Sequence, residues 1–494
     1  MMNLINWAAL TPEIILLTMA CVVALVDLFV TDPQRRLTYG LTQASLLVVG
    51  LLHLQQFDAG LTLYALNNMV VTDPMGRLLG VFATLAVMLA VAYAQPYIGP
   101  RSMLKGEFFV LSMFALLGIS VMLSANDFLV VYLGLEVMSL SLYAMVALRR
   151  DDATATEAAM KYFVLGALAS GFLLYGLSMM YGATGTLELP KVFEVISQGR
   201  VNAEVLVFGV VFIVAGLGFK LGVAPFHMWV PDVYQGAPTA VTLMIASAPK
   251  LAAFAITIRL LVEGLLKVAV DWQQMLLVMA VLSLVVGNLA AIAQTNLKRM
   301  LAYSAIAQMG FMLLAMGSGV VDGNTVSAGN AYSSAMFYMI TYVLTTLGSF
   351  GLIMLLARDG FESEEIADWA GLAKRRPWMA GVMSVFMFSL AGIPPTMGFY
   401  AKLAVLQALI TTDHTGYLIL AIVAVLLSLV AAFYYLRIVK VMYFDEPTQA
   451  ELTQDFGMPG ALMMINGAAV LVLGLLPGGL MAVCRDAIVR ALAT

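Results

Sequence analysis

The sequence has 494 residues, of which 62% are hydrophobic and 11% charged, and its net charge is -4 at pH 7. A water-soluble domain usually carries about a quarter charged residues, so this composition argues against a soluble enzyme. The chain has no long basic run, which argues against nucleic acid as a partner. Its two cysteines, Cys21 and Cys484, are far apart and only three histidines accompany them, so no metal or iron–sulfur site is expected.

Apolar stretches of roughly 20 residues, the length that a helix needs to cross a bilayer, recur along the chain between Pro, Gly or charged residues. The first stretch lacks the Arg- and Ser-rich character of a transit peptide and is expected to be retained as a helix. We therefore predict an all-α polytopic membrane protein with about fourteen transmembrane helices, at 10–30, 38–56, 75–95, 107–124, 127–148, 158–181, 204–224, 239–262, 273–294, 299–317, 331–357, 377–411, 415–443 and 459–483.

Positive charges alternate between the connections. Loops rich in Lys and Arg stay on the cytoplasmic side of a membrane. Connections after odd-numbered stretches hold Arg35, Arg36, Arg101, Lys105, Arg149, Arg150, Lys298, Arg299, Arg358, Lys374, Arg375 and Arg376, whereas the others hold chiefly Lys191, Arg200 and Lys267. Both termini are therefore predicted to be periplasmic.

Two pairs of short segments suggest an internal repeat with an offset of about 170 residues. Ala159 to Tyr162 resembles Ala335 to Tyr338, and Gly222 to Pro225 resembles Gly392 to Pro395. Five predicted helices separate the copies, and an odd number inverts the second copy relative to the first, as in many transporters. Chance matches between apolar segments are the alternative. The predicted divisions are three N-terminal helices (1–106), two repeats (107–270 and 271–445) and a C-terminal helix (446–494).

Each predicted repeat has proline inside a long helix, at Pro225 and at Pro394 and Pro395. Proline removes a backbone donor and breaks a helix. Inside a membrane a break survives where protein or a water-lined cavity satisfies the freed groups, and the half-helix ends can act on bound ions. The alternative is a packing kink.

Four ionisable residues lie within apolar helices near these breaks: Glu136, Lys220, Lys250 and Lys402. An unpaired charge there is costly. Burial favours the neutral form of a lysine and a nearby carboxylate favours the charged form, so alternating Lys and Glu residues can hold and release protons. We predict that these four residues form a proton relay. The alternatives are a fixed ion pair that orients helices and, for Lys402, a side chain that reaches the membrane interface.

Three further residues have less specific signals. His227 follows Pro225 by two positions and could bridge water between the lysines, or could be a structural histidine. Lys161 could belong to an entry pathway or reach toward the cytoplasmic surface. Asp232 is interpreted as a helix cap, with proton acceptance as the alternative.

The motifs around the first break resemble a known family. Gly216 to Lys220 (GLGFK), Val223 to Trp229 (VAPFHMW) and Pro231 to Pro238 (PDVYQGAP) are similar to the seventh-helix signature of the antiporter-like membrane subunits of NADH:quinone oxidoreductase, respiratory complex I. Further similarity, specifically to the subunit N (subunit 2) branch, lies in Ala248 to Lys250, Gln294 to Arg299 and Ser389 to Phe399.

This resemblance implies fourteen helices, two inverted five-helix repeats with broken helices 7 and 12, and functional roles for Glu136, Lys220, Lys250 and Lys402. It also implies an inner-membrane complex in which NADH, FMN, iron–sulfur clusters and quinone are used by other subunits, with no cofactor in this chain. The expected partners are neighbouring membrane subunits, lipid and protons. One departure is Gln308, which stands where related proteins often have a histidine in the tenth helix and which cannot titrate.

Two other functions fit the same residues. A cation/proton antiporter of the related Mrp type, or more remotely a membrane-bound hydrogenase subunit, would use buried Lys and Glu without this redox partner. A membrane scaffold would use the charges to lock helices together.

Overall fold

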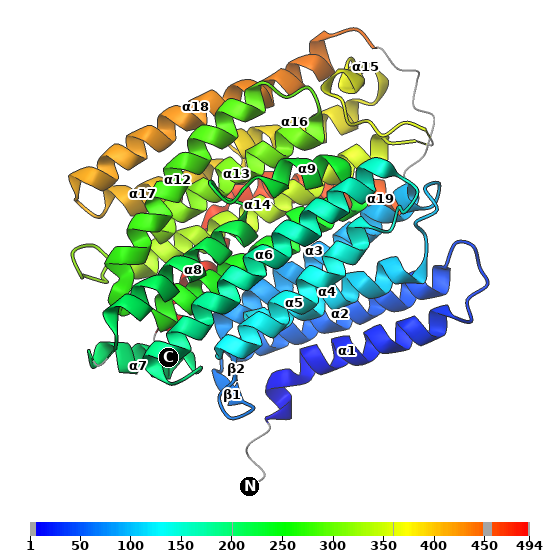
Figure 1. Cartoon of the computed structure of the whole chain (residues 1–494). Helices are drawn as coiled ribbons and strands as arrows, with labels where there is room; N and C mark the ends of the chain where they lie inside the picture. Colours follow the sequence, from blue (N-terminus) through cyan, green and yellow to red (C-terminus); the bar gives the residue numbers. More distant parts are fainter. Residues whose placement is uncertain (1–5, 200, 359, 448–456, 493–494) are drawn as a thin grey trace.

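The computed structural model describes residues 6–199, 201–358, 360–447 and 457–492 as a bundle of long, roughly aligned helices (Figure 1). Within these residues thirteen helices are long and apolar enough to cross a membrane. The chain is therefore an all-helical, multi-pass membrane protein. Arg200, one of the charges in the predicted periplasmic connections, and residues 448–456 of the predicted C-terminal division lie outside the described residues.

The N-terminal part consists of three helices and a small hairpin. The helices are α1 (Trp7–Asp27), α2 (Arg36–Ala59) and α3 (Pro74–Ile98), and the antiparallel hairpin is β1 (Leu63–Ala65) and β2 (Val70–Thr72). Asp73 caps α3 by accepting a hydrogen bond from Gly76 N at 2.7 Å, with Pro74 at the first helical position, where its missing N–H costs nothing. No pattern in the sequence predicted the hairpin.

The next part contains the first break. It comprises α4 (Gly106–Leu123), α5 (Phe128–Val146), α6 (Ala153–Thr184), α7 (Leu189–Ser197), α8 (Ala203–Leu221) and α9 (Trp229–Gly236). Asp127, Asp152 and Asn202 cap α5, α6 and α8 with their side chains. The predicted seventh helix thus ends before Pro225 and resumes after it.

The middle part holds the most deeply buried helices. It comprises α10 (Thr239–Ala246), α11 (Ala248–Thr257), the π-helix η1 (Ile258–Gly264), the short 3-10 helix η2 (Leu266–Val268), α12 (Ala269–Ile292), α13 (Leu297–Met316) and α14 (Ala328–Leu356). The predicted eighth helix is interrupted at Ser247, which the sequence analysis did not anticipate. The apolar core of α14 is fully enclosed by other helices.

The C-terminal part contains the second break and explains the count of thirteen. It comprises η3 (Ile366–Trp369), α15 (Leu372–Arg375), α16 (Pro377–Ala391), α17 (Met397–Ile410), α18 (Thr415–Phe444), α19 (Gly457–Leu475) and α20 (Pro477–Leu492). The predicted twelfth helix is divided into α16 and α17, each too short to count as a span. The last predicted helix, 459–483, is corrected to two helices that meet at Leu476, because Pro477 cannot continue the hydrogen bonding of α19.

The two ends of the described chain lie at one end of the bundle. Figure 1 shows the hairpin, α7 and the start of α1 together, with α15 at the opposite end. Leu492 lines a cavity there with Tyr64 of the hairpin and Phe193 of α7. The positive loops meet at the other end, where Arg101 and Arg149 both contact Glu362.

Candidate functional site

The break between α8 and α9 is built around Gly222. This residue ends α8 in the left-handed conformation, with φ of 76°, and a Cβ atom there would also approach Val230 to 2.7 Å. Glycine is therefore favoured for both its backbone and its size. Trp229 Nε1 donates a hydrogen bond to Phe219 O at 3.0 Å, which ties the start of α9 to the last turn of α8.

Lys250 occupies the end of α8. Its ammonium donates to Leu221 O at 2.7 Å and to Lys220 O at 3.5 Å, and the residue is only 2% exposed. The last carbonyls of a helix lack partners within the helix and carry the negative end of its dipole. Backbone carbonyls therefore stabilise the Lys250 charge, and in the described chain no carboxylate lies within 4.0 Å of it.

Lys220 lies near Glu136 without pairing with it. Its ammonium donates to Ser139 Oγ at 3.1 Å and to Ser170 Oγ at 3.3 Å. Glu136 interacts with it electrostatically but forms no ion pair within 4.0 Å, and within the described residues Glu136 Oε1 has no hydrogen-bond partner. The predicted pair is thus brought together as neighbours that do not touch.

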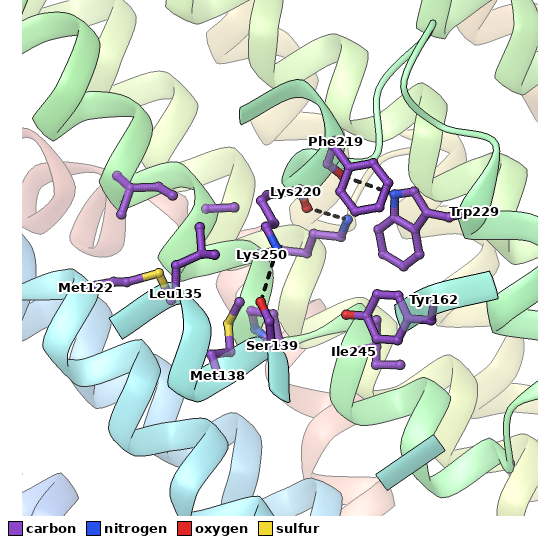
Figure 2. A pocket seen from close by; sticks show the side chains of 13 residues that line it. Met122, Leu135, Met138, Ser139, Tyr162, Phe219, Lys220, Trp229, Ile245 and Lys250 are labelled. Carbon is purple, nitrogen blue, oxygen red and sulfur yellow. Dashed lines mark hydrogen bonds between the residues drawn. The ribbon is translucent and has the colours of Figure 1, made fainter. Parts of the chain in front are cut away.

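A small cavity joins Lys220 and Lys250 (Figure 2). Ser139, Tyr162 and Trp229 are among its lining residues, and the rings of Tyr162 and Trp229 stack at 4.9 Å. The space open to the centres of water molecules is about 20 Å³, which is enough for about one water. One water there could connect the two lysines.

The break between α16 and α17 repeats the first arrangement. Gly392 ends α16 with φ of 83°. Lys402 on α17 donates to Ala391 O at 2.9 Å and to Ser428 Oγ at 2.8 Å, and is 7% exposed. A buried lysine therefore binds the last carbonyl before a left-handed glycine at both breaks.

Gln308 shares a small cavity with Lys402. Its amide donates to Leu390 O and to Tyr435 Oη, each at 2.9 Å, and accepts a hydrogen bond from Tyr338 Oη. Ser304 Oγ lies 2.5 Å from Tyr435 Oη and extends the network. These groups are neutral, but hydroxyls and amides can orient water beside the lysine.

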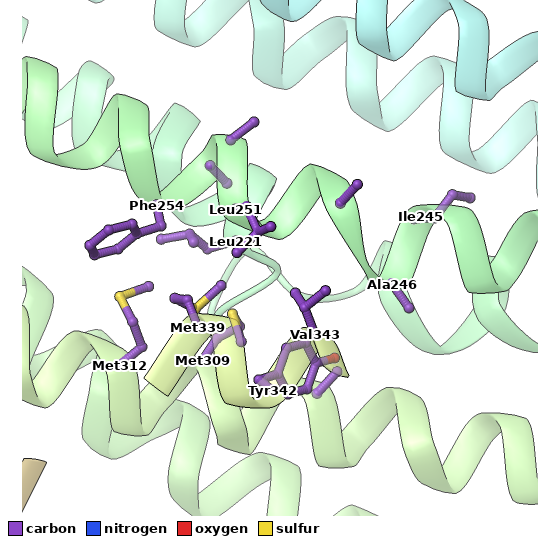
Figure 3. Close-up of a cluster of buried hydrophobic side chains, with 14 of the residues drawn as sticks. Leu221, Ile245, Ala246, Leu251, Phe254, Met309, Met312, Met339, Tyr342 and Val343 are labelled. Carbon is purple, nitrogen blue, oxygen red and sulfur yellow. The ribbon is translucent and has the colours of Figure 1, made fainter. Parts of the chain in front are cut away.

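An apolar layer adjoins both cavities. Figure 3 shows buried side chains from α8, α10, α11, α13 and α14 packed together. Ile245 belongs to this cluster and to the Lys220–Lys250 cavity, while Tyr342 belongs to the cluster and to the Lys402 cavity. The same cluster contains Leu221, Leu251, Phe254, Met309, Met312 and Met339.

Lys161 and Asp232 form an ion network rather than a helix cap. Lys161 Nζ contacts Asp232 Oδ2 and Glu157 Oε1, each at 2.8 Å, and Arg299 Nη1 contacts Asp232 Oδ1 at 2.8 Å. The capping interpretation of Asp232 was wrong, because two cations on α6 and α13 engage its carboxylate and α9 has no side-chain cap.

His227 lies in the loop between α8 and α9. It is half-buried, and its Nδ1 has no hydrogen-bond partner in the described part of the chain. It is not among the residues that line the Lys220–Lys250 cavity. A bridging role for His227 therefore stays a prediction.

Several polar groups escaped the sequence analysis. The serines that contact Lys220 and Lys402 are ordinary residues in apolar helices, and no signal singled them out. A buried ion cluster was also missed: Arg259 contacts Asp73 at 2.7 Å and Glu263 at 2.8 Å. Arg259 and Glu263 are charges four residues apart near a membrane helix end, which was a usable signal.

The described residues contain no group of three or more His, Cys, Asp or Glu side chains that could hold a metal ion. The chemistry available at the two breaks is that of amines, hydroxyls, amides and a carboxyl group. The amines and the carboxyl group can bind and release protons, and the hydroxyls and amides can form hydrogen bonds with water beside them.

A family model described as NADH:quinone oxidoreductase/Mrp antiporter, TM, matches residues 125–428. The chain is 61% identical to NADH-quinone oxidoreductase subunit N of Polaromonas naphthalenivorans (strain CJ2), over 99% of this chain and 98% of that protein. It is 60% identical to the subunit N of Herminiimonas arsenicoxydans, over the full length of both.

Solved structures have the same fold. A chain of respiratory complex I from Thermus thermophilus with bound aureothin matches with a TM-score of 0.80 and 30% identity, over 96% of this chain and all of that one. A chain of the Mrp complex from Dietzia sp. DQ12-45-1b matches with a TM-score of 0.83 at 19% identity, over 98% and 97% of the two chains. The second likeness concerns the fold alone.

Proposed function

Since the chain belongs to the antiporter-like membrane subunits of NADH:quinone oxidoreductase and is a proton-translocating subunit of bacterial complex I, we propose that Glu136, Lys220, Lys250 and Lys402 form its proton relay. Electron transfer from NADH to quinone occurs in other subunits, which hold the FMN and iron–sulfur clusters. This chain contributes proton-binding side chains and the bundle that encloses them.

The proposal includes the finer architecture expected from the sequence. If α16 and α17 together cross the membrane once, the chain has fourteen crossings, and α8 with α9 forms the broken seventh one. The glycine and lysine arrangement shared by the two breaks supports two inverted repeats, at 107–270 and 271–445. An even number of crossings places both termini on one side, which the positive loops predict to be the periplasm.

The observation that carries the proposal is the shared position of Lys250 and Lys402. Each ammonium rests on the last carbonyl of an interrupted helix, at 2.7 and 2.9 Å. Dipoles stabilise a charge less firmly than a paired carboxylate does, so such a lysine can lose its proton when its surroundings change. A lysine locked in an ion pair would instead keep its proton.

Proton movement between the two halves requires water in the apolar layer. The cluster that contains Met309 and Met339 adjoins both cavities through Ile245 and Tyr342, and methionine side chains are flexible enough to rearrange. We propose that a proton passes from Lys220 to Lys250 through the small cavity and then reaches Lys402 when this layer is hydrated.

Quinone reduction is coupled to proton transfer through Glu136 and Lys220, the first two residues of the relay. A change driven by quinone reduction elsewhere alters the separation of Glu136 and Lys220 and so the stability of the lysine charge. Lys161 is the proposed entry residue and His227 an auxiliary one. Neighbouring antiporter-like subunits are the proposed partners that transmit the change.

The test is Lys220→Ala in membranes that contain the assembled complex. We expect NADH:quinone turnover and proton pumping to fall together while native gels show an intact complex. Lys191→Ala is a matched control, because this lysine is exposed in α7 and pairs with Glu188 at the bundle surface. Wild-type turnover and pumping in the Lys220 variant would contradict the relay.

A further inference from the structure

We propose that Ser139 and Ser170 are positioning residues that hold the Lys220 ammonium away from Glu136, so that Lys220 alternates between a hydroxyl site and a carboxylate site. The inference rests on the proposed relay and adds the acceptors of its unpaired state. Ser139 lies on α5 and Ser170 on α6, so the hydroxyl site is formed between two helices.

The contacts define the hydroxyl site. Lys220 Nζ donates to Ser139 Oγ at 3.1 Å and to Ser170 Oγ at 3.3 Å. The two serines are 2% and 3% exposed, so bulk water does not compete for these hydrogen bonds. Two buried hydroxyls therefore take the place that a carboxylate would fill in an ion pair.

The serines differ from other serines in these helices. A serine inside a helix commonly bonds to the carbonyl one turn before it, as Ser141 does with Val137 O at 2.7 Å and Ser112 with Phe108 O at 2.7 Å. In the described chain, Ser139 and Ser170 make no such bond to their own helices. Their hydroxyl oxygens are directed to Lys220 instead (Figure 2 shows the Ser139 bond).

The carboxylate site is one helical turn away. Glu136 precedes Ser139 by three residues, so both side chains lie on neighbouring positions of one face of α5. Glu136 interacts electrostatically with Lys220, and its buried Oε1 has no hydrogen-bond partner in the described residues. A flexible lysine side chain can reach from one site to the other by changing rotamer.

The Lys220 ammonium therefore has two environments, the hydroxyl site and the carboxylate site. At the hydroxyl site the ammonium has neutral acceptors and faces the cavity that contains Lys250. At the carboxylate site it has a full counter-charge. The serines thereby determine how long Lys220 stays at the position from which it can pass its proton toward Lys250.

The experiment uses the assembled complex carrying Ser139→Ala with Ser170→Ala, with Ser141→Ala on the same helix as the control. Removing hydrogen bonds to a charged group should lower kcat for NADH:quinone turnover by about tenfold. The KM for quinone should stay within about twofold of wild type, because quinone binds elsewhere. The control should retain wild-type kcat.

Cryo-electron microscopy of the complex with the double variant measures the position of Lys220. This position would not change if the two serines had only a structural role. We expect Lys220 Nζ to lie within ion-pair distance of Glu136. Wild-type kcat, or an unchanged Lys220 position in the double variant, overturns the inference. If Lys220→Ala is itself fully active, the proposed relay fails; if only the serine variants are fully active, the relay stands and the positioning role fails.

Discussion

The two helix breaks place lysines in the same backbone setting but in different electrostatic surroundings. At both, a lysine binds the last carbonyl before a left-handed glycine. The first break has a second lysine, Lys220, with Glu136 near it. The second has Lys402 beside a neutral network of Gln308, Tyr338 and Tyr435.

This difference separates two ways of stabilising a buried charge. Carbonyls at a helix end are dipoles whose own charge does not change, and they stabilise the ammonium groups of Lys250 and Lys402 without a full counter-charge. A carboxylate can move or change its charge, so Glu136 offers Lys220 a variable environment. We therefore expect Glu136 and Lys220 in the first repeat to control proton transfer. We expect Lys402 in the second repeat to respond to that control.

Removing the lysine of the second break should have the largest effect. Lys402→Ala leaves Ala391 O and Ser428 without their charged partner and removes a proton carrier, so turnover and pumping should fall by about a hundredfold, as for loss of a general acid–base group. Turnover assays with quantified complex measure this. Lys267→Ala, at an exposed lysine outside the breaks, should be near wild type, and equal activity of the two variants would place Lys402 outside the relay.

Adding a methyl group at the second break should have an intermediate effect. Gly392→Ala forces a non-glycine residue to φ of 83° and brings its Cβ to 2.7 Å from Lys402 Cδ, so it should destabilise the subunit by about 1–2 kcal/mol and displace the lysine. Thermal unfolding and turnover of the purified complex measure both effects. Gly381→Ala is the control, since nothing lies within 4 Å of its added Cβ; equal melting of the two variants would contradict the strain.

Weakening the contact between the end of α3 and the loop after α14, at the α15 end of the bundle, should have the smallest effect. Glu362 accepts hydrogen bonds from Arg101 Nε and Tyr97 Oη, each at 2.9 Å. Burial alone would raise the pKa of Glu362, but Arg101 and Tyr97 hold it below its usual range. The stabilisation is therefore present above the unfolded pKa of about 4.3 and is lost as pH falls through the lower folded value.

Glu362→Gln should consequently destabilise the complex by less than about 1 kcal/mol at pH 7, with a difference from wild type that shrinks in acid. Thermal melting across pH measures this. A difference that grows as the pH falls would show that the carboxylate does not contribute through its charge.

The sequence predicted the helices well where a single physical signal determined them. Long apolar stretches correspond to membrane helices, and Pro225 and Pro394 mark both breaks, because a missing backbone donor acts locally. The interruption at Ser247 was missed because its neighbour Pro249 also fits an ordinary first turn of a helix. The hairpin at Leu63 was missed because three-residue strands leave almost no periodic pattern.

The candidate site was predictable in its charges but not in its contacts. An ionisable residue in an apolar helix is visible in sequence, so Glu136, Lys220, Lys250 and Lys402 could be selected. Which atom each ammonium binds depends on helix packing. The carbonyl of Leu221 and the hydroxyl of Ser139 therefore could not be predicted as partners of the lysines. Asp232 was misassigned for the same reason, since Lys161 and Arg299 approach it from other helices.

The enclosure of α14 has a consequence for how the protein is made. This helix contacts α3, which is synthesised early, and α19 and α20, which are synthesised last. Its Thr341, Thr345 and Ser349 hydroxyls bond to carbonyls of their own helix, which satisfies them before any neighbour arrives. We therefore expect α14 to lie in the membrane with one side uncovered during synthesis. That side is covered when α19 and α20 pack against it.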